Sequence, residues 1–236
     1  METKPNFSPR AMLIRALKDY DRSRERTQQV ELGPSSLGDC ERKVYHELIG
    51  TPKIQETEIL PALLGTFIHA GIEKAIKSED PFGDDFFIEI AAQLGAEFNN
   101  MPGHADLFMN SVACVVDWKT TTKKSMAYFP SRSNIWQAQN YGLMMEEQGR
   151  TVKWVCVVVV PRDGRMADIG EWIAPYDREI ALEGQRWLAE LRVRAENKDM
   201  PEPTKNAKDY CQFYCEYFDP TAEVGCPGLA GRRGSF

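Results

Sequence analysis

The spacing of apolar residues along the chain predicts an alternation of helices and strands. Helical spacing, with an apolar residue every three to four positions, runs through residues 60–77, 133–148 and 177–198. Short apolar runs rich in β-branched and aromatic residues predict strands over 85–92, 104–109, 112–118 and 152–161, and an edge strand over 167–174. The order helix, three strands, helix, strand predicts an α/β fold with a small mixed sheet flanked by helices.

The two ends of the chain differ from this central part. Residues 10–30 are highly charged with a weak apolar stripe, which predicts a helix. Turn and N-cap residues at 33–36 predict a short helix that begins near Ser35 or Ser36 and contains Cys40. From residue 200 the chain is Pro-rich and is expected to be irregular. We therefore expect a helical extension and one domain, residues 1–32 and 33–236.

Composition narrows the class of protein. The 236 residues are 42% hydrophobic, as in a globular protein with a sizeable core. No apolar run is long enough to span a membrane, and the N-terminus has no apolar signal-peptide core. We expect a cytoplasmic protein. The net charge of −6 means that an enzyme of nucleic acids would have to rely on local basic patches.

The third strand-like run ends in an unusual way, with Asp117 and Lys119 two residues apart. Residues i and i+2 of a strand point to the same face, so the two charges are expected side by side at the margin of a core. Either they neutralise each other as an ordinary ion pair, or both face a charged ligand.

Further polar residues fall on the neighbouring predicted elements. His69 lies on the first core helix and Asp106 begins the second strand, while Gln137 and Tyr141 share one face of the next helix. Two aspartates, a histidine and a lysine suit metal-assisted hydrolysis of a phosphodiester with Mg²⁺ or Mn²⁺. Each residue alone has a plainer interpretation, such as a core histidine. Glu89 is either a further acid near the metal or a solvated strand residue.

Taken in order, these residues resemble the RecB-family exonuclease branch of the PD-(D/E)xK nuclease superfamily. That branch has a helix histidine, a Gly-x-x-Asp strand, an Asp-x-Lys strand and a Gln-x-x-x-Tyr helix, here His69, Gly103 with Asp106, Asp117 with Lys119, and Gln137 with Tyr141. The resemblance implies a restriction-endonuclease-like α-β-β-β-α-β core. It also implies that the divalent ion is held by His69, Asp106, Asp117 and the main-chain carbonyl of Trp118. Lys119 would be catalytic, and Gln137 and Tyr141 would position DNA.

The six cysteines fall into two groups. Cys114 and Cys156 lie inside apolar runs and are expected in the core. The other four lie in polar or turn-rich surroundings: Cys40, Cys211, Cys215 and Cys226. Their spacing fits a zinc ribbon poorly. It resembles the iron–sulfur nucleases of the RecB group, which include AddB-type subunits and the CRISPR-associated exonucleases of Cas family four. The resemblance implies a structural [4Fe–4S] cluster that ties the 200–236 tail to Cys40, and zinc remains the alternative.

The implied activity is that of a metal-dependent DNA exonuclease acting on single-stranded ends with 5′ to 3′ polarity. Lys123 and Lys124 are expected to line a groove for DNA or to be solvated lysines without a ligand. The chain has no phosphate-binding loop and hence no ATP motor of its own. One alternative is a DNA-end-binding adaptor in CRISPR spacer acquisition or phage recombination, and another is an RNA or structure-specific endonuclease. A recombination, helicase or CRISPR-integration partner and a homo-oligomer are both compatible with these interpretations.

Overall fold

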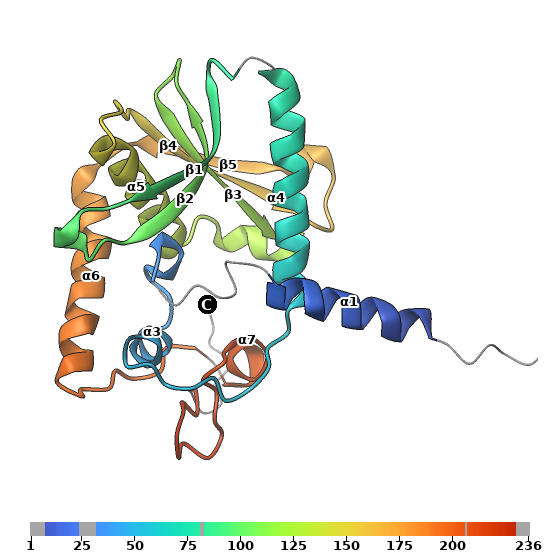
Figure 1. The fold of residues 1–236 in the computed structure, drawn as a ribbon, viewed down its shortest axis with the longest axis vertical. Coiled ribbons are helices and arrows are strands. Elements are labelled where there is room, and N and C mark those ends of the chain that lie inside the picture. The colour runs from blue at the N-terminus through green and yellow to red at the C-terminus, as the bar shows by residue number, and fades with distance from the viewer. Residues whose placement is uncertain (1–7, 24–31, 81–82, 206, 230–236) are drawn as a thin grey trace, which may run out of the picture.

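The chain folds around one five-stranded mixed sheet, which occupies the upper half of Figure 1. The computed structural model describes residues 8–23, 32–80, 83–205 and 207–229. Neighbouring strands follow the order of the chain: β1 (Phe86–Gln93), β2 (Pro102–Met109), β3 (Cys114–Thr121), β4 (Trp154–Pro161) and β5 (Gly170–Pro175). β3 and β4 are parallel, and the other neighbours are antiparallel. The predicted α/β fold with a small mixed sheet is confirmed.

Three helices cover the two faces of the sheet. α5 (Arg132–Glu147) is the crossover that a parallel β3–β4 pair requires. It packs with α6 (Arg178–Glu196) on one face, where side chains of both helices join the core around Val115 and Val157. α4 (Leu60–Glu79) covers the other face and contributes Ile76 to a smaller cluster around Val116 and Cys156. The two faces are thus filled by alternate residues of the same strands.

At the ends of the chain, the predicted 10–30 helix is confirmed as far as Ser23, and two other predictions need correction. The first helix is α1 (Pro9–Ser23), and the rest of the predicted 10–30 helix lies outside the described residues. The helix expected from Ser35 or Ser36 is instead a 3-10 turn, η1 (Pro34–Ser36), followed by α3 (Glu41–Leu48) with Cys40 at its N-cap. Gly38 separates the two because its φ of +73° is incompatible with a helix. The tail contains short helical turns, η5 (Ala207–Cys211) and α7 (Gln212–Tyr214).

α1 lies against α4 and projects from the body of the molecule (Figure 1). Its described contacts are few: the ring of Tyr20 lies 5.6 Å from that of Phe67, and Lys18 Nζ lies 2.9 Å from Glu56 Oε2. No residue of α1 is buried. Among the helices described, none has an apolar stretch of the length needed to cross a membrane.

Candidate active site and cysteine cluster

The strand ladder between β1 and β2 is interrupted opposite Asp106. A continuous register would pair Glu89 with Asp106, but Glu89 has φ +51°, a left-handed conformation that a glutamate adopts at a cost of about 1–3 kcal/mol. At this interruption the side chains of β2 change from one face of the sheet to the other. Leu107 packs in the cluster beneath α4, whereas Ala105, two residues away, packs in the core beneath α5. Residues two apart in a regular strand share a face, so Asp106 lies where β2 changes sides.

At this point the pairing of β2 with β3 also ends. The last paired residues are Leu107 and Val116, and beyond them the Asp106 carboxylate replaces the main-chain ladder. Its Oδ2 atom accepts the N–H of Trp118 at 2.7 Å. Because the N–H and C=O of one strand residue face the same neighbouring strand, the Trp118 carbonyl faces the Asp106 side as well.

Asp117 and Lys119 lie side by side, as the sequence predicts. Lys119 Nζ is 2.7 Å from Asp117 Oδ2, and the Asp117 side chain is only 3% exposed. Although this ion pair is close, Oδ2 accepts no hydrogen bond of ordinary geometry. Burial raises the pKa of Asp117, Lys119 opposes that rise, and the charge of Asp106 adds to it. The site thus holds a buried carboxylate, Asp117, whose negative charge is not fully offset by the neighbouring Lys119.

His69 approaches Asp106 from α4, the helix on the other face of the sheet from α5. Its Nδ1 atom lies 3.6 Å from Asp106 Oδ1, on the side of the carboxylate away from Trp118. α4 approaches β3 closely here because Gly65 lacks a side chain: a Cβ at that position would lie 3.2 Å from Thr120 Oγ1. Glu89 lies nearby and is exposed, and its pKa is raised by desolvation and then by the charge of Asp106.

Gln137 and Tyr141 are buried behind this site. Gln137 Nε2 lies 3.4 Å from Asp117 Oδ1 and donates to the Tyr141 hydroxyl at 3.0 Å. Each residue is 6% exposed, so in this structure they support the Asp117 carboxylate. Their direct action on DNA stays a prediction. Gly103 has a packing role, because a Cβ there would come within 2.8 Å of the Met144 sulfur.

The two lysines that follow the site differ from each other. Lys123 donates to Asp168 at 2.8 Å through its ammonium and to Asp163 at 2.7 Å through its N–H, which fixes the turn after β3. Lys124 lies on the exposed side of the same turn. Lining of a DNA groove stays a prediction for both.

The donor atoms at this site suit a hard divalent ion. Two carboxylates, an imidazole and a strand carbonyl are the oxygen and nitrogen ligands that Mg²⁺ and Mn²⁺ accept, and the buried Asp117 Oδ2 lacks a partner of good geometry. As they stand, no three His, Cys, Asp or Glu side chains in the described ranges are arranged around one ion. The fit is therefore one of chemistry and location, and the ion stays a prediction.

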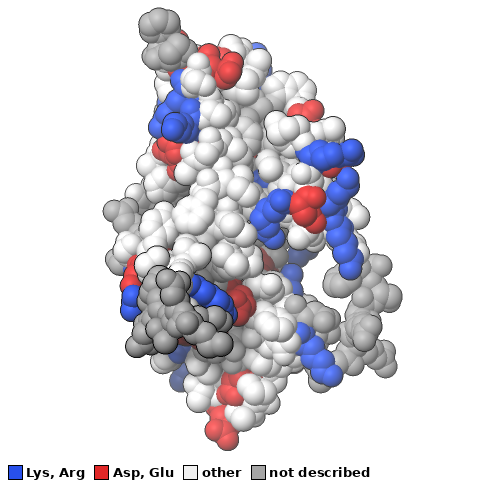
Figure 2. Space-filling model, turned by 90° about the vertical axis from the view of Figure 1, so that its right-hand side faces the viewer, with Lys and Arg blue, Asp and Glu red and all other residues white. Residues whose placement is uncertain are grey.

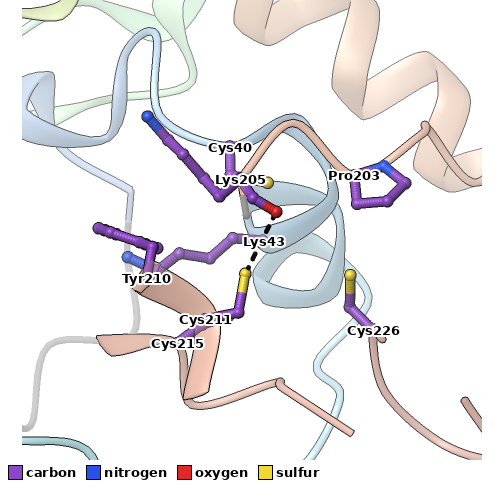
Figure 3. A pocket seen from close by; sticks show the side chains of 8 residues that line it. All are labelled: Cys40, Lys43, Pro203, Lys205, Tyr210, Cys211, Cys215 and Cys226. Carbon is purple, nitrogen blue, oxygen red and sulfur yellow. Dashed lines mark hydrogen bonds between the residues drawn. The ribbon is translucent and has the colours of Figure 1, made fainter. Parts of the chain in front are cut away.

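Four cysteines from the two ends of the domain line one pocket (Figure 3). Cys40 comes from the start of α3, Cys211 and Cys215 from the helical turns of the tail, and Cys226 from the loop beyond. All four are thiols and 5–6% exposed. Cys114 and Cys156 are buried elsewhere, beneath α4, which confirms the prediction that they belong to the core.

Main-chain hydrogen bonds hold the two sides of this pocket together. The N–H groups of Ile54 and Glu58 donate to Glu216 O and Phe213 O, both at 2.8 Å. The side-chain amide of Gln55 donates to the carbonyls of Cys211 and Cys215, at 3.0 and 2.8 Å. Residues 54–58 lead directly into α4, so the cysteine pocket is joined to the helix that carries His69.

A loop built on Asp219 returns the chain to Cys226. Its carboxylate accepts the Thr221 hydroxyl at 2.6 Å and the N–H of Val224 at 3.0 Å, and its own N–H donates to Cys226 O at 2.9 Å. These contacts, the Thr221 hydroxyl first, hold the pKa of Asp219 well below its usual range. Nothing in the spacing of apolar residues indicated this role or that of Gln55.

The four thiols fit a thiophilic metal centre by their burial and convergence. Burial, and after it the neighbouring cysteines, raise the pKa of Cys211 to about 12. Burial likewise raises the pKa of Cys215 to about 11. Such groups become thiolates only when a cation lies beside them. A cubane cluster spreads four thiolates over several iron atoms, so its ligands need not surround a single ion.

Comparison with known proteins shows that this fold also occurs in a solved structure. No family model and no curated protein matches the chain. The structure of SSO0001 is similar with a TM-score of 0.54 and 17% identity over 90% of this chain and 96% of that one. The alkaline exonuclease LHK-Exo from Laribacter hongkongensis gives 0.48 and 15%, over 72% and 91%. A phage-related exonuclease from Haemophilus somnus 129PT gives 0.45 and 10%, over 84% and 89%. At such identities the first match shows a shared fold alone, and the two scores below 0.5 carry no argument.

Proposed function

We propose that the protein is a metal-dependent deoxyribonuclease of the RecB type, acting as an exonuclease on single-stranded DNA ends. The observation that carries the proposal is the convergence of His69, Asp106, Asp117 and Lys119 where the β2–β3 ladder opens. A buried carboxylate short of positive charge, beside a second carboxylate and a lysine, is suited to a cation and a phosphate.

Each residue has a role that follows from its place. His69, Asp106, Asp117 and the Trp118 carbonyl would hold Mg²⁺ or Mn²⁺. The ion, when bound, orients a water, lowers its pKa and offsets charge in the transition state. Lys119 lies beside Asp117 with its side chain 26% exposed, so its ammonium is open to a phosphoryl oxygen or to the attacking water. Gln137 keeps the Asp117 carboxylate in place from behind.

Substrate and polarity rest on the family resemblance, which favours single-stranded ends and the 5′ to 3′ direction. The surface supports a nucleic-acid partner in one respect. Although the chain is acidic overall, Lys and Arg side chains gather along one edge of the face seen in Figure 2. Lys123 and Lys124, in the turn that leaves the site, would extend positive charge along the DNA backbone.

The four cysteines would hold a [4Fe–4S] cluster with a structural role. The cluster would cross-link α3 to the tail and so keep the segment before α4 in place. Zinc is the competing occupant, because four thiolates serve both. A homo-oligomer and a recombination, helicase or CRISPR-integration partner belong to the same proposal, and α1, with no buried residue, is the element available for them.

The test uses protein purified without oxygen. End-labelled single- and double-stranded DNA is digested with Mg²⁺ or Mn²⁺ by the wild type and by Lys119→Ala. Lys153→Ala is the matched control, since Lys153 lies at the other end of the sheet beside Ala113. We expect metal-dependent shortening from one end, reduced about 10³-fold or more by Lys119→Ala and unchanged by Lys153→Ala. DNA binding without cleavage in any metal would replace the nuclease by an end-binding adaptor.

A further inference from the structure

A second pocket opens beside Lys119, at the start of α5. It measures about 170 Å³ and lies between the end of β3, the turn after it and the first turn of α5. Its lining includes Lys119, Thr121, Ser125, Tyr128, Phe129 and Asn134. Apart from Lys119, none of these residues belongs to the motifs that led to the nuclease proposal.

We infer that this pocket receives the base of the nucleotide next to the scissile phosphate, which must be unpaired to enter. The inference rests on the proposed nuclease function, because Lys119 belongs to both the metal site and the pocket wall. A phosphate held at Lys119 places the base of an adjoining nucleotide within reach of the pocket. A base in a duplex is stacked and paired and cannot enter such a pocket without leaving the helix.

The size of the pocket suits one base. At about 30 Å³ for each water, 170 Å³ is the room of five or six waters, well below the roughly 300–1,000 Å³ of pockets for larger ligands. Lys119 is the one charged residue in its lining. The phosphate is therefore drawn to the Lys119 end, and the neutral remainder is left for the base.

The lining offers both stacking and hydrogen bonding. Tyr128 is 64% exposed and Phe129 follows it in the chain, so two aromatic residues line the pocket that an incoming base would enter. Asn134 Oδ1 accepts the N–H of Ser131 at 3.0 Å, which caps α5 and leaves the amide NH₂ directed elsewhere. That NH₂ donates to no residue in the described part of the chain. Every base carries an acceptor that such a donor can meet, so the pocket is expected to tolerate all four.

The experiment compares intact single-stranded DNA with DNA carrying one abasic residue at successive positions from the digested end. For the wild type we expect cleavage to slow about tenfold to a hundredfold when the abasic residue adjoins the scissile bond, the range that loss of base stacking gives. Tyr128→Ala should slow intact DNA by a similar factor and leave the abasic substrate unaffected. Tyr128→Phe keeps the ring and should behave as the wild type.

A second readout does not need catalysis. 2-Aminopurine at the sensitive position should lose fluorescence on binding to the wild type, and keep it with Tyr128→Ala. Equal cleavage of intact and abasic DNA, together with unchanged 2-aminopurine fluorescence, would overturn the base pocket while leaving the nuclease intact. Absence of cleavage with Tyr128-dependent quenching would instead overturn the nuclease and keep the pocket as a site for an unpaired base.

Discussion

The acidic site and the cysteine pocket both assemble residues from distant parts of the chain, but they are held in different ways. Asp106, Asp117 and Lys119 sit on adjoining strands, and their positions follow from main-chain pairing and a packed core. The cysteines sit on short turns joined by a few hydrogen bonds, with Gln55 as the main side-chain link.

This difference indicates which of the two sites depends on its bound ligand for stability. The sheet and its core position Asp117 and Lys119, and burying the charge of Asp117 lowers stability, which the surrounding core offsets. The cysteine pocket is held by hydrogen bonds between short turns and not by the sheet, so a cluster there would add a cross-link between α3 and the tail. Removing a ligand should therefore destroy activity at the first site and stability at the second.

The largest expected effect is on activity at the acidic site. Asp117→Asn keeps the shape of the side chain and its contact with Gln137, but it removes the buried charge. We expect activity to fall by about 10³-fold or more, while the melting temperature of the metal-free protein stays the same or rises. Rates on labelled DNA and thermal melts in EDTA measure both. A large drop in melting temperature would mean that the Asp117–Lys119 pair stabilises the fold.

The reverse pattern is expected for a cluster ligand. Cys215→Ala should abolish the visible iron–sulfur absorption and lower the melting temperature by about 10 °C or more, with activity lost only as the protein unfolds. Cys156→Ala removes a buried thiol outside the cluster and is the matched control, so it should keep the colour. Normal folding and activity of Cys215→Ala would contradict a structural cluster.

The smallest expected effect tests the loop that returns to Cys226. The pKa of Asp219 is lowered in the folded protein, so its stabilisation is present above the unfolded pKa and is lost as pH falls through the folded pKa. Asp219→Asn should lower the melting temperature by a few degrees between pH 5 and 8. The gap to the wild type should narrow steadily as the pH falls below about 4, the unfolded pKa, towards the lower pKa of the folded protein. A gap that stays constant into acid would mean that the carboxylate charge is not what orders the loop.

Much of the fold was predictable because it rests on local patterns. The strand runs and the three core helices were readable from periods of two and 3.6, and strand alternation placed Asp117 beside Lys119. The turn and N-cap residues at 33–36 predicted the start of the next helix wrongly. Gly38 adopts a left-handed conformation, so this helix begins only at Glu41.

The sequence by itself determined the order of elements, the α/β class and which acids, histidine and cysteines were candidates. The tertiary structure decided how they meet. The left-handed Glu89, the turning over of β2 at Asp106 and the clamp of Gln55 on two cysteine carbonyls depend on partners far along the chain. The spacing of apolar residues predicts which face of a helix or strand a residue lies on. Backbone strain and hydrogen bonds of this kind form only when segments distant in the chain pack together.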